Sequence, residues 1–337
     1  MRPSTSLYHA ATLLALITSA AAAVISSSRP IVQNTQAPVN ISLPNRLADD
    51  DVRFSLRGHH GEEAVNIISL LVNTVHALAN LAHQPFRKRI SGFHVDILPW
   101  YADLDISIQP AAPARDIDVQ VAVTALYYVV YNMIDTKTFK NAAFDILWDG
   151  SVVGQIQINK AAGPSQTLSA GFNRPQISSE QPLPLLNDTI ATNRTTNHSL
   201  REAGLSLFYS YFPQAGIMSF QEVFITLMAA LRCLSHFPSA QVVEPFETGA
   251  RGYVAWMKFY GAEPPRTEPP FLTYAILIET VRQIPFHMME SKLFAELQVL
   301  IGYDDAPVGQ AVLQNGSPEL SGIRSCGGSS GCNVSSS

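Results

Sequence analysis

The sequence predicts an α+β protein in which helices cover one face of antiparallel sheets. Helix-period apolar patterns alternate with pairs of short strand-period patterns along the chain. Two stretches also resemble each other: AAFDILWDGSVVGQIQI (142–158) and LQVLIGYDDAPVGQAVL (297–313) both place Val-Gly-Gln after a turn. We therefore predict four tandem helix–β-hairpin units. A helix–hairpin–helix–hairpin pair is a circular permutation of the βαββαβ order, so two ferredoxin-like-related halves are one arrangement to expect.

The first unit is predicted to begin with a helix over Glu62–His83. Its apolar positions recur at steps of three and four residues, which gives one apolar face: Val65, Ile68, Val72, Val75, Ala79 and Ala82. Glu62 and Glu63 would then lie at the positive end of the helix dipole. The predicted hairpin pairs Phe93–Ile97 with Leu104–Ile108.

The second unit combines a helix over Asp116–Asp135 with the hairpin of residues 142–158. A two-residue turn at Asp149-Gly150 would place Ile156 on the face opposite Ile146. A three-residue loop, Asp149–Ser151, gathers the apolar residues of both strands on one face. Because a slip of one residue moves every side chain to the other face, we predict the three-residue loop.

The third and fourth units follow the same plan. Ser219 and Glu222 have the spacing of a capping box, so a helix is expected from Ser219. The fourth helix is expected to open at 267–270, where prolines suit a first turn. A strand-like run, Leu205–Phe212, precedes the third unit. The predicted hairpins are Val242–Phe246 with Tyr253–Phe259, and Leu293–Ile301 with Val308–Leu313.

The first residues are typical of a secretory signal peptide. Arg2 precedes a short apolar run, and Ala21–Ala23 offers a cleavage site. The predicted organisation is a signal peptide (1–23), an extended segment (24–55), a first helix–hairpin pair (56–160), a glycosylated polar linker (161–200), a second pair (201–314) and a Gly/Ser-rich tail (315–337).

Composition favours a secreted protein that binds neither nucleic acid nor membrane. Hydrophobic residues make up 47% of the chain, enough for a sizeable core, and charged residues only 15%. The net charge of −5 offers no basic surface for nucleic acid. The apolar run of the leader is too short to span a bilayer, and the tail lacks the hydrophobic end of a lipid anchor.

Secretion gives meaning to the Asn-x-Ser/Thr triplets and to two cysteines. Asn315 is followed by Gly-Ser-Pro, where proline hinders modification. The predicted glycosylation sites are Asn40, Asn187, Asn193, Asn197 and Asn333. Cys326 and Cys332 bracket GGSSG and are predicted to form a disulfide in an oxidising compartment.

The register of the first hairpin predicts an acidic site. It places Asp96 opposite Asp105 and His94 opposite Ser107 on the polar face. Close carboxylates share a proton, bind a cation or act as an acid/base pair. Screening by water, or a register shifted by two residues, would leave no site.

Two further groups are weak candidates for binding. His59, His60, Glu62 and Glu63 have the one-turn spacing of helical metal ligands, but no third His lies near, and a solvated helix start explains the same residues. Trp100 and Tyr101 lie in a predicted loop, where aromatic rings can stack on sugars or pack against the sheet. No cofactor-binding motif is present, so no cofactor is expected.

These features predict a secreted, N-glycosylated, non-catalytic binding or host-interaction (effector-like) protein. Its partner would be an extracellular protein or glycan. One alternative is a secreted hydrolase that acts on polysaccharide through Asp96 and Asp105. The other is a wall-associated structural protein.

Overall fold

The computed structural model describes residues 39–41, 54–95, 98, 101–161, 204–212, 214–250, 252–316 and 324–325, all of them within the unit Pro38–Ser337. These residues form four helices and three sheets, and every strand pair except β10–β14 is antiparallel. The predicted α+β class is therefore confirmed.

The first sheet has the strand order β1-β2-β7-β8-β5-β4. A separate two-stranded sheet pairs β3 (Arg89–Ile90) with β6 (Ile117–Asp118), which lie between β2 and β7 in the sequence. The strands of the first sheet are β1 (Val39–Ile41), β2 (Phe54–Ala64), β4 (Phe93–His94), β5 (Leu104–Pro110), β7 (Lys140–Trp148) and β8 (Ser151–Lys160).

The second sheet has the strand order β14-β10-β11-β13-β12-β9. The predicted lone strand before the third helix is present as β9. The strands are β9 (Leu205–Tyr211), β10 (Phe246–Gly249), β11 (Ala255–Gly261), β12 (Leu297–Tyr303), β13 (Ala306–Asn315) and β14 (Arg324–Ser325).

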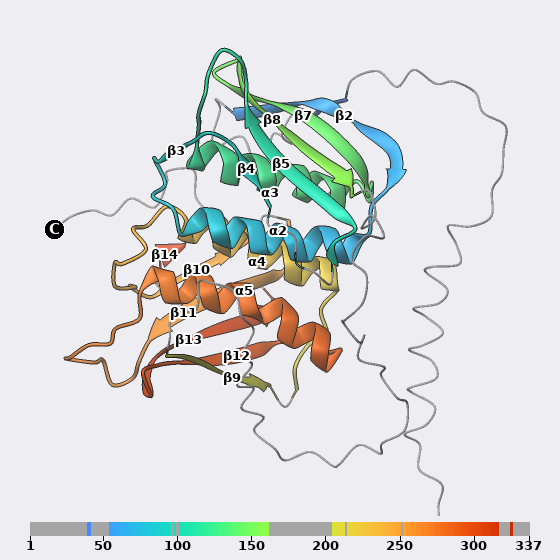
Figure 1. Cartoon of the computed structure of the whole chain (residues 1–337). Coiled ribbons are helices and arrows are strands. Elements are labelled where there is room, and N and C mark those ends of the chain that lie inside the picture. The colour runs from blue at the N-terminus through green and yellow to red at the C-terminus, as the bar shows by residue number, and fades with distance from the viewer. Residues whose placement is uncertain are drawn as a thin grey trace, which may run out of the picture. The chain divides into compact units, whose positions relative to one another are not determined.

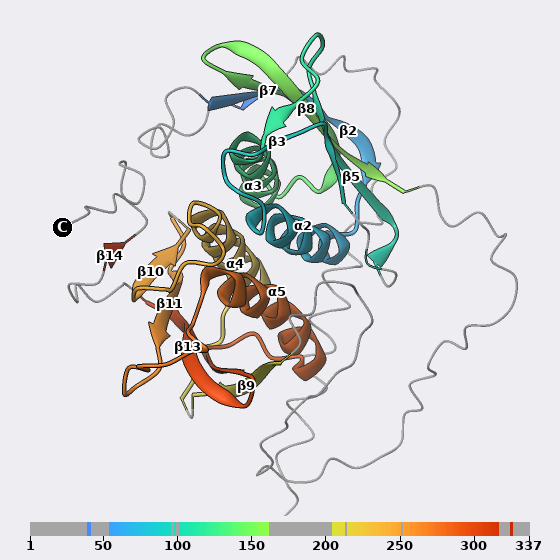
Figure 2. The same cartoon turned by 60° about the vertical axis from the view of Figure 1, so that its left-hand side comes forward.

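The four helices lie between the two sheets, as Figures 1 and 2 show. They are α2 (Ile67–Ala82), α3 (Val119–Asp135), α4 (Phe220–Leu234) and α5 (Tyr274–Ser291). α2 contacts α3, α4 and α5, so helices of both halves share one continuous hydrophobic core. Each sheet therefore buries one face against helices and turns its other face outward.

The two sheets have the same strand order when each is followed from the strand that precedes its first helix. In the first, β2 pairs with β7, and β8, β5 and β4 follow; in the second, β9 pairs with β12, and β13, β11 and β10 follow. One helix of each half comes directly after the strand that starts this order: α2 after β2, and α4 after β9. The other helix lies in the sequence between two strand pairs: α3 between β4–β5 and β7–β8, and α5 between β10–β11 and β12–β13. The Val-Gly-Gln stretches lie on β8 and β13, which hold equivalent places in this order.

The glycine of each Val-Gly-Gln stretch allows close approach of a neighbouring strand. A Cβ on Gly309 would lie 2.4 Å from the carbonyl oxygen of Tyr260 on β11. A Cβ on Gly154 would lie 2.9 Å from the carbonyl oxygen of Gln109 on β5. The resemblance in the sequence thus corresponds to a shared packing requirement.

The predicted three-residue hairpin loop is wrong, although its consequence for the core is right. Asp149 and Gly150 form a two-residue turn with φ values of 51° and 74°, and Trp148 pairs with Ser151. Such turns match the twist of the strands. A bulge between Ile146 and Leu147 then restores the register. The apolar residues expected to share the interior are buried: Phe144, Ile146, Ile156 and Ile158.

Two predicted helix starts are also wrong. α2 begins at Ile67 after the N-cap Asn66, because residues up to Ala64 continue strand β2 and pair with β7. Glu62 and Glu63 therefore lie on a strand and not on a helix dipole. α5 begins at Tyr274 after the N-cap Thr273, so the prolines at 269 and 270 lie in a loop. The capping box of Ser219 and Glu222 is confirmed.

Candidate functional site

The outward face of the second sheet carries an apolar and aromatic row, which we call the second outer face. Phe208, Leu300, Gln310 and Tyr260 lie side by side across β9, β12, β13 and β11. Phe208 is 40% exposed and Leu300 48% exposed. An exposed apolar group on a sheet already packed on its other face is typical of a contact surface.

A hollow of about 620 Å³ lies beside this row. It is lined by Leu300, Pro307 and Gln310 of the sheet and by the loop of residues 261–268. The Arg266 guanidinium is oriented by its own loop: Nε donates to the carbonyl oxygen of Glu268 at 3.3 Å and Nη2 to that of Pro269 at 3.4 Å. Apolar and charged lining residues together suit a ligand with both kinds of surface.

An aromatic and charged pair lies on the same sheet, at strands β10 and β11. The Nζ of Lys258 lies 4.1 Å from the centre of the Trp256 ring, a cation–π contact. Glu247 faces Lys258 across the β10–β11 pair. Glu247 is buried, and its Oε2 has no hydrogen-bond partner within the described part of the chain.

The outward face of the first sheet differs in chemistry, and we call it the first outer face. Amides dominate it, and Gln157 Nε2 donates to Gln155 Oε1 at 2.7 Å. Arg57 Nη2 and Asp145 Oδ2 lie 3.2 Å apart in an exposed ion pair. Water can satisfy such groups, so this face needs no partner.

The predicted register of the first hairpin is confirmed where it is described. Phe93 pairs with Ile108 and His94 with Ser107. The Nδ1 of His94 lies 3.4 Å from Oδ1 of Asp105, within ion-pair range but without hydrogen-bond geometry. Asp96 lies outside the described residues, so the predicted Asp96–Asp105 pair is not seen.

The predicted sugar-stacking residues fall in different places. Trp100 lies outside the described residues. Tyr101 is partly buried against the core, and its hydroxyl donates to the Met289 sulfur at 3.7 Å. Burial raises the pKa of the Tyr101 hydroxyl. Its side chain is therefore engaged by α5 rather than presented at a loop tip.

The predicted helical spacing of His59, His60, Glu62 and Glu63 does not exist, because all four residues lie on β2. Successive side chains on a strand point to opposite faces. His60 packs edge-on against Phe144, with ring centres 5.3 Å apart, and burial lowers its pKa. Across the described ranges, no three His, Cys, Asp or Glu residues gather as a metal site would require.

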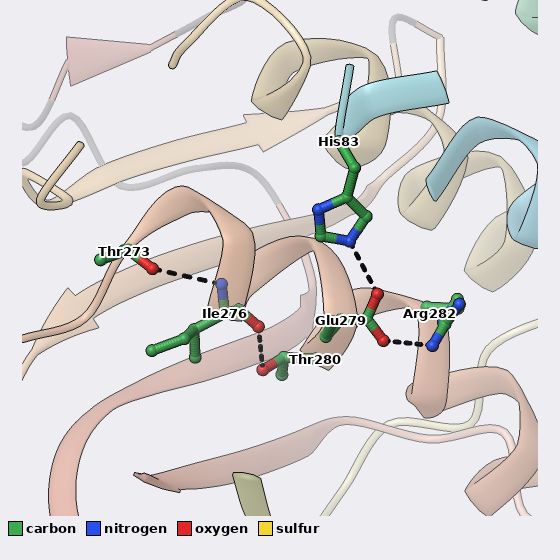
Figure 3. A network of polar contacts seen from close by, with 6 residues as sticks. All are labelled: His83, Thr273, Ile276, Glu279, Thr280 and Arg282. Carbon is green, nitrogen blue, oxygen red and sulfur yellow. Dashed lines mark hydrogen bonds and ion pairs between the residues drawn. The ribbon is translucent and has the colours of Figure 1, made fainter. Parts of the chain in front are cut away.

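A buried polar network joins the two halves, as Figure 3 shows. The Nε2 of His83, at the end of α2, lies 2.7 Å from Oε1 of Glu279 on α5. The second oxygen of Glu279 contacts the Arg282 guanidinium. The sequence patterns above do not identify Glu279. A single acidic residue inside the apolar run YAILIETV is nevertheless a signal that could have indicated a buried carboxylate.

We call His83, Glu279 and Arg282 the clamp, because they link α2 to α5. All three side chains are largely shielded from water. Thr273 and Thr280 fix the same turn of α5: the Thr273 hydroxyl accepts from the Ile276 N–H, and the Thr280 hydroxyl donates to the Ile276 carbonyl (Figure 3). The Glu279 carboxylate, held between the His83 imidazole and the Arg282 guanidinium, links α2 to α5.

An aromatic cluster forms a second contact between the halves. The Arg232 guanidinium of α4 lies 5.3 Å from the Tyr127 ring centre and 5.0 Å from that of Tyr128, both on α3. Tyr131 on α3 meets Tyr253 edge-on at 5.8 Å. Burial raises the pKa of Tyr253 to about 12. The Tyr253 hydroxyl is therefore neutral where its ring meets Tyr131.

The remaining predicted sites are not visible. Asn40 lies on β1, whose side chains are not described, and Asn187, Asn193, Asn197, Asn333, Cys326 and Cys332 lie outside the described residues. Within the described ranges, no helix is long and apolar enough to cross a membrane. No family model, curated protein or solved structure matches the chain.

Proposed function

We propose that the chain is a secreted, N-glycosylated binding protein without catalysis, which holds an extracellular partner on the second outer face. The carrying observation is the hollow lined by Leu300, whose cross-strand neighbour on β9 is the exposed Phe208. The clamp and the aromatic cluster hold the helices together and leave the outward faces as the functional surfaces.

The lining of the hollow supports a glycan or an extended protein segment as partner. Leu300 and Pro307 give an apolar lining, while Gln310 and Arg266 give hydrogen-bonding groups. Because the Arg266 guanidinium is already oriented by backbone carbonyls, a ligand would lose little entropy in ordering it.

The test is binding by the purified full-length chain to a glycan array and to immobilised extracellular proteins. Leu300→Lys and Arg266→Ala should each weaken retention by roughly tenfold or more, as expected for central contact residues. Gln157→Lys on the first outer face is the matched control and should leave retention unchanged. Retention lost equally in all three variants would remove the second outer face from the proposal.

A polysaccharide hydrolase remains the second candidate, because His94 and Asp105 lie 3.4 Å apart on an accessible face. A carboxylate beside an imidazole can perform acid–base chemistry. Release of reducing sugar by the secreted chain, abolished by Asp105→Asn and by His94→Gln, would establish this activity. No release from a panel of wall polysaccharides would leave binding as the function.

We also propose that the two halves arose by duplication of a helix–hairpin arrangement related to the ferredoxin-like order. The equal strand order of the two sheets supports this proposal, as does the equivalent placing of Gly154 and Gly309. In each half a strand, β2 or β9, also comes directly before the first helix, and a plain series of four helix–hairpin units does not contain this strand.

A further inference from the structure

Strand β9 forms an edge of the second sheet, and on its outer side no strand is paired in the described part of the chain (Figure 1). Its counterpart in the first sheet, β2, is covered on that side. There β1 pairs with β2, placing Val39 opposite Gly58 and Ile41 opposite Leu56. The two halves thus differ at equivalent edges.

The backbone of β9 presents an open ladder. The N–H of Phe212 donates to the Glu296 carbonyl, and the N–H of Asp304 donates to the Gly204 carbonyl. In an antiparallel pair the bonded positions alternate, so the even-numbered residues of β9 bond to β12. Leu205, Leu207, Tyr209 and Tyr211 therefore direct their N–H and C=O groups outward.

The edge lacks the usual protection against strand pairing. The sequence LSLFYSY contains no charged residue and no proline, whereas natural edges commonly carry one or the other. Within the residues that the structure describes, the other edge strands of the two large sheets, β1, β4 and β14, span two or three residues each. β9, with seven residues, is the long edge in the described sheets.

Exposed apolar side chains gather beside this edge. Eight large hydrophobic residues are exposed in the described ranges, and four of them belong here: Phe208, Ile217, Leu293 and Leu300. Phe208 and Leu300 are neighbours across β9 and β12. Ile217 bridges to Ala295 just before β12, and the Leu293 carbonyl accepts from the Tyr211 hydroxyl at 3.0 Å.

We propose that β9 pairs with β9 of a second copy of this chain, antiparallel and centred on Phe208, so that the two second sheets join into one. Charge favours this occupant, because two neutral strands meet without like charges opposite each other. The cross-strand partners are also compatible: Phe208 faces Phe208 and Ser206 faces Ser210 on the outer side, and Leu207 faces Tyr209 on the inner side.

The register agrees with the direction of the open groups. Leu207 and Tyr209 of opposite copies form the hydrogen-bonded pairs, and the two Phe208 residues form a non-hydrogen-bonded pair, in which side chains approach most closely. An isologous contact of this kind closes as a dimer and does not propagate. The inference goes beyond the proposed function and does not depend on it.

The first test is the mass of the full-length chain by analytical ultracentrifugation over a wide concentration range. The chain should sediment as a dimer, and Phe208→Lys should shift it to monomer by placing two lysines opposite each other. Val152→Lys is the matched control, since Val152 is 41% exposed on the first sheet, and should leave the dimer intact. A monomeric wild-type chain, or a dimer unaffected by Phe208→Lys, would overturn the proposal.

The second test fixes the register by disulfide trapping. In a non-hydrogen-bonded pair the Cα atoms lie about 4.5 Å apart, which a disulfide can span. Phe208→Cys should cross-link to itself under mild oxidation, and peptide mapping distinguishes this link from any involving Cys326 or Cys332. Ser206→Cys alone should not cross-link, but it should do so with Ser210→Cys in a mixture. The reverse pattern would contradict pairing centred on Phe208.

Discussion

The two sheets are built in the same strand order but face the solvent differently. The first outer face consists of amides, histidines and exposed ion pairs such as Arg57–Asp145. The second carries Phe208, Leu300 and Tyr260 beside the hollow. Both inward faces are apolar and pack against helices. The fold therefore constrains the inward residues and leaves the outward residues free to differ between the two sheets.

A second comparison is between an exposed ion pair and a buried one. The exposed pair Arg57–Asp145 has side chains 52% and 35% exposed, whereas the buried pair Arg282–Glu279 has side chains 11% and 5% exposed. Shielded ions that lose a partner are costly, and exposed ions are not. Substitutions can therefore separate residues that hold the halves together from residues that only meet water.

The largest expected effect comes from Glu279→Ala, which leaves Arg282 and His83 without their carboxylate. Removing one partner of a buried pair should cost roughly 3–5 kcal/mol of unfolding free energy. Arg57→Ala on the first outer face should cost about 1 kcal/mol or less. Urea unfolding of both variants measures the comparison. Equal losses of unfolding free energy would show that the Glu279 network does not hold the two halves together.

The equivalent glycines should respond unequally to alanine. A Cβ on Gly309 meets backbone oxygen at 2.4 Å, while a Cβ on Gly154 meets backbone oxygen at 2.9 Å and, at 2.7 Å, the end of the Ile117 side chain, which can shift. Both variants should lose stability, by roughly 1–3 kcal/mol for overpacking, with Gly309→Ala the larger loss. Thermal unfolding of the pair checks the order, and a neutral Gly309→Ala would contradict it.

Each half contains a histidine whose pKa is lowered by burial, His60 in the first and His287 in the second. His287 stacks on Tyr209, with ring centres 3.9 Å apart. Below the ordinary value of 6.5 the unfolded chain takes up a proton that the folded chain resists, so stability should fall as pH falls below 6.5.

His287→Phe keeps a ring against Tyr209 and removes the proton site, so unfolding free energy should decline less between pH 7 and pH 5. His60→Phe makes the equivalent change beside Phe144 in the first half. Urea unfolding at several pH values measures both slopes. A slope that neither substitution reduces would place the acid sensitivity elsewhere.

The smallest effect concerns two helix starts. Ser219 caps α4 in a full capping box, whereas the α3 N-cap, Asp118, makes no side-chain cap hydrogen bond. Ser219→Ala should cost about 1 kcal/mol. Asp118→Ala should cost clearly less. Chemical denaturation resolves this difference, and a larger loss at Asp118 would reverse the comparison.

The sequence allowed the interior to be predicted better than the edges. Alternation placed Phe144, Ile146, Ile156 and Ile158 together because burial of one face determines register. It missed β2, because His59 to Glu63 has the polarity of a helix start and its strand character comes from pairing with distant β7. The hollow was missed for a similar reason: the 261–268 loop and Leu300 meet only in three dimensions.

Turn chemistry explains the misplaced hairpin loop. Asp149-Gly150 is a favoured two-residue turn, and the bulge opposite Ile146 reconciles it with burial of Ile156. A bulge has no reliable signature in a single sequence. β12 and β13 repeat the device, with Asp304-Asp305 as the turn and a register shift after Ile301.

The most direct measurement is hydrogen–deuterium exchange of the full-length chain, alone and bound to the glycan or extracellular protein that it retains. Recognition by the second outer face should slow exchange in the 261–268 loop and in β12, and should leave β4, β5 and β8 of the first sheet unchanged. Protection confined to β4, β5 and β8, around His94 and Asp105, would contradict this result and assign recognition to the first sheet.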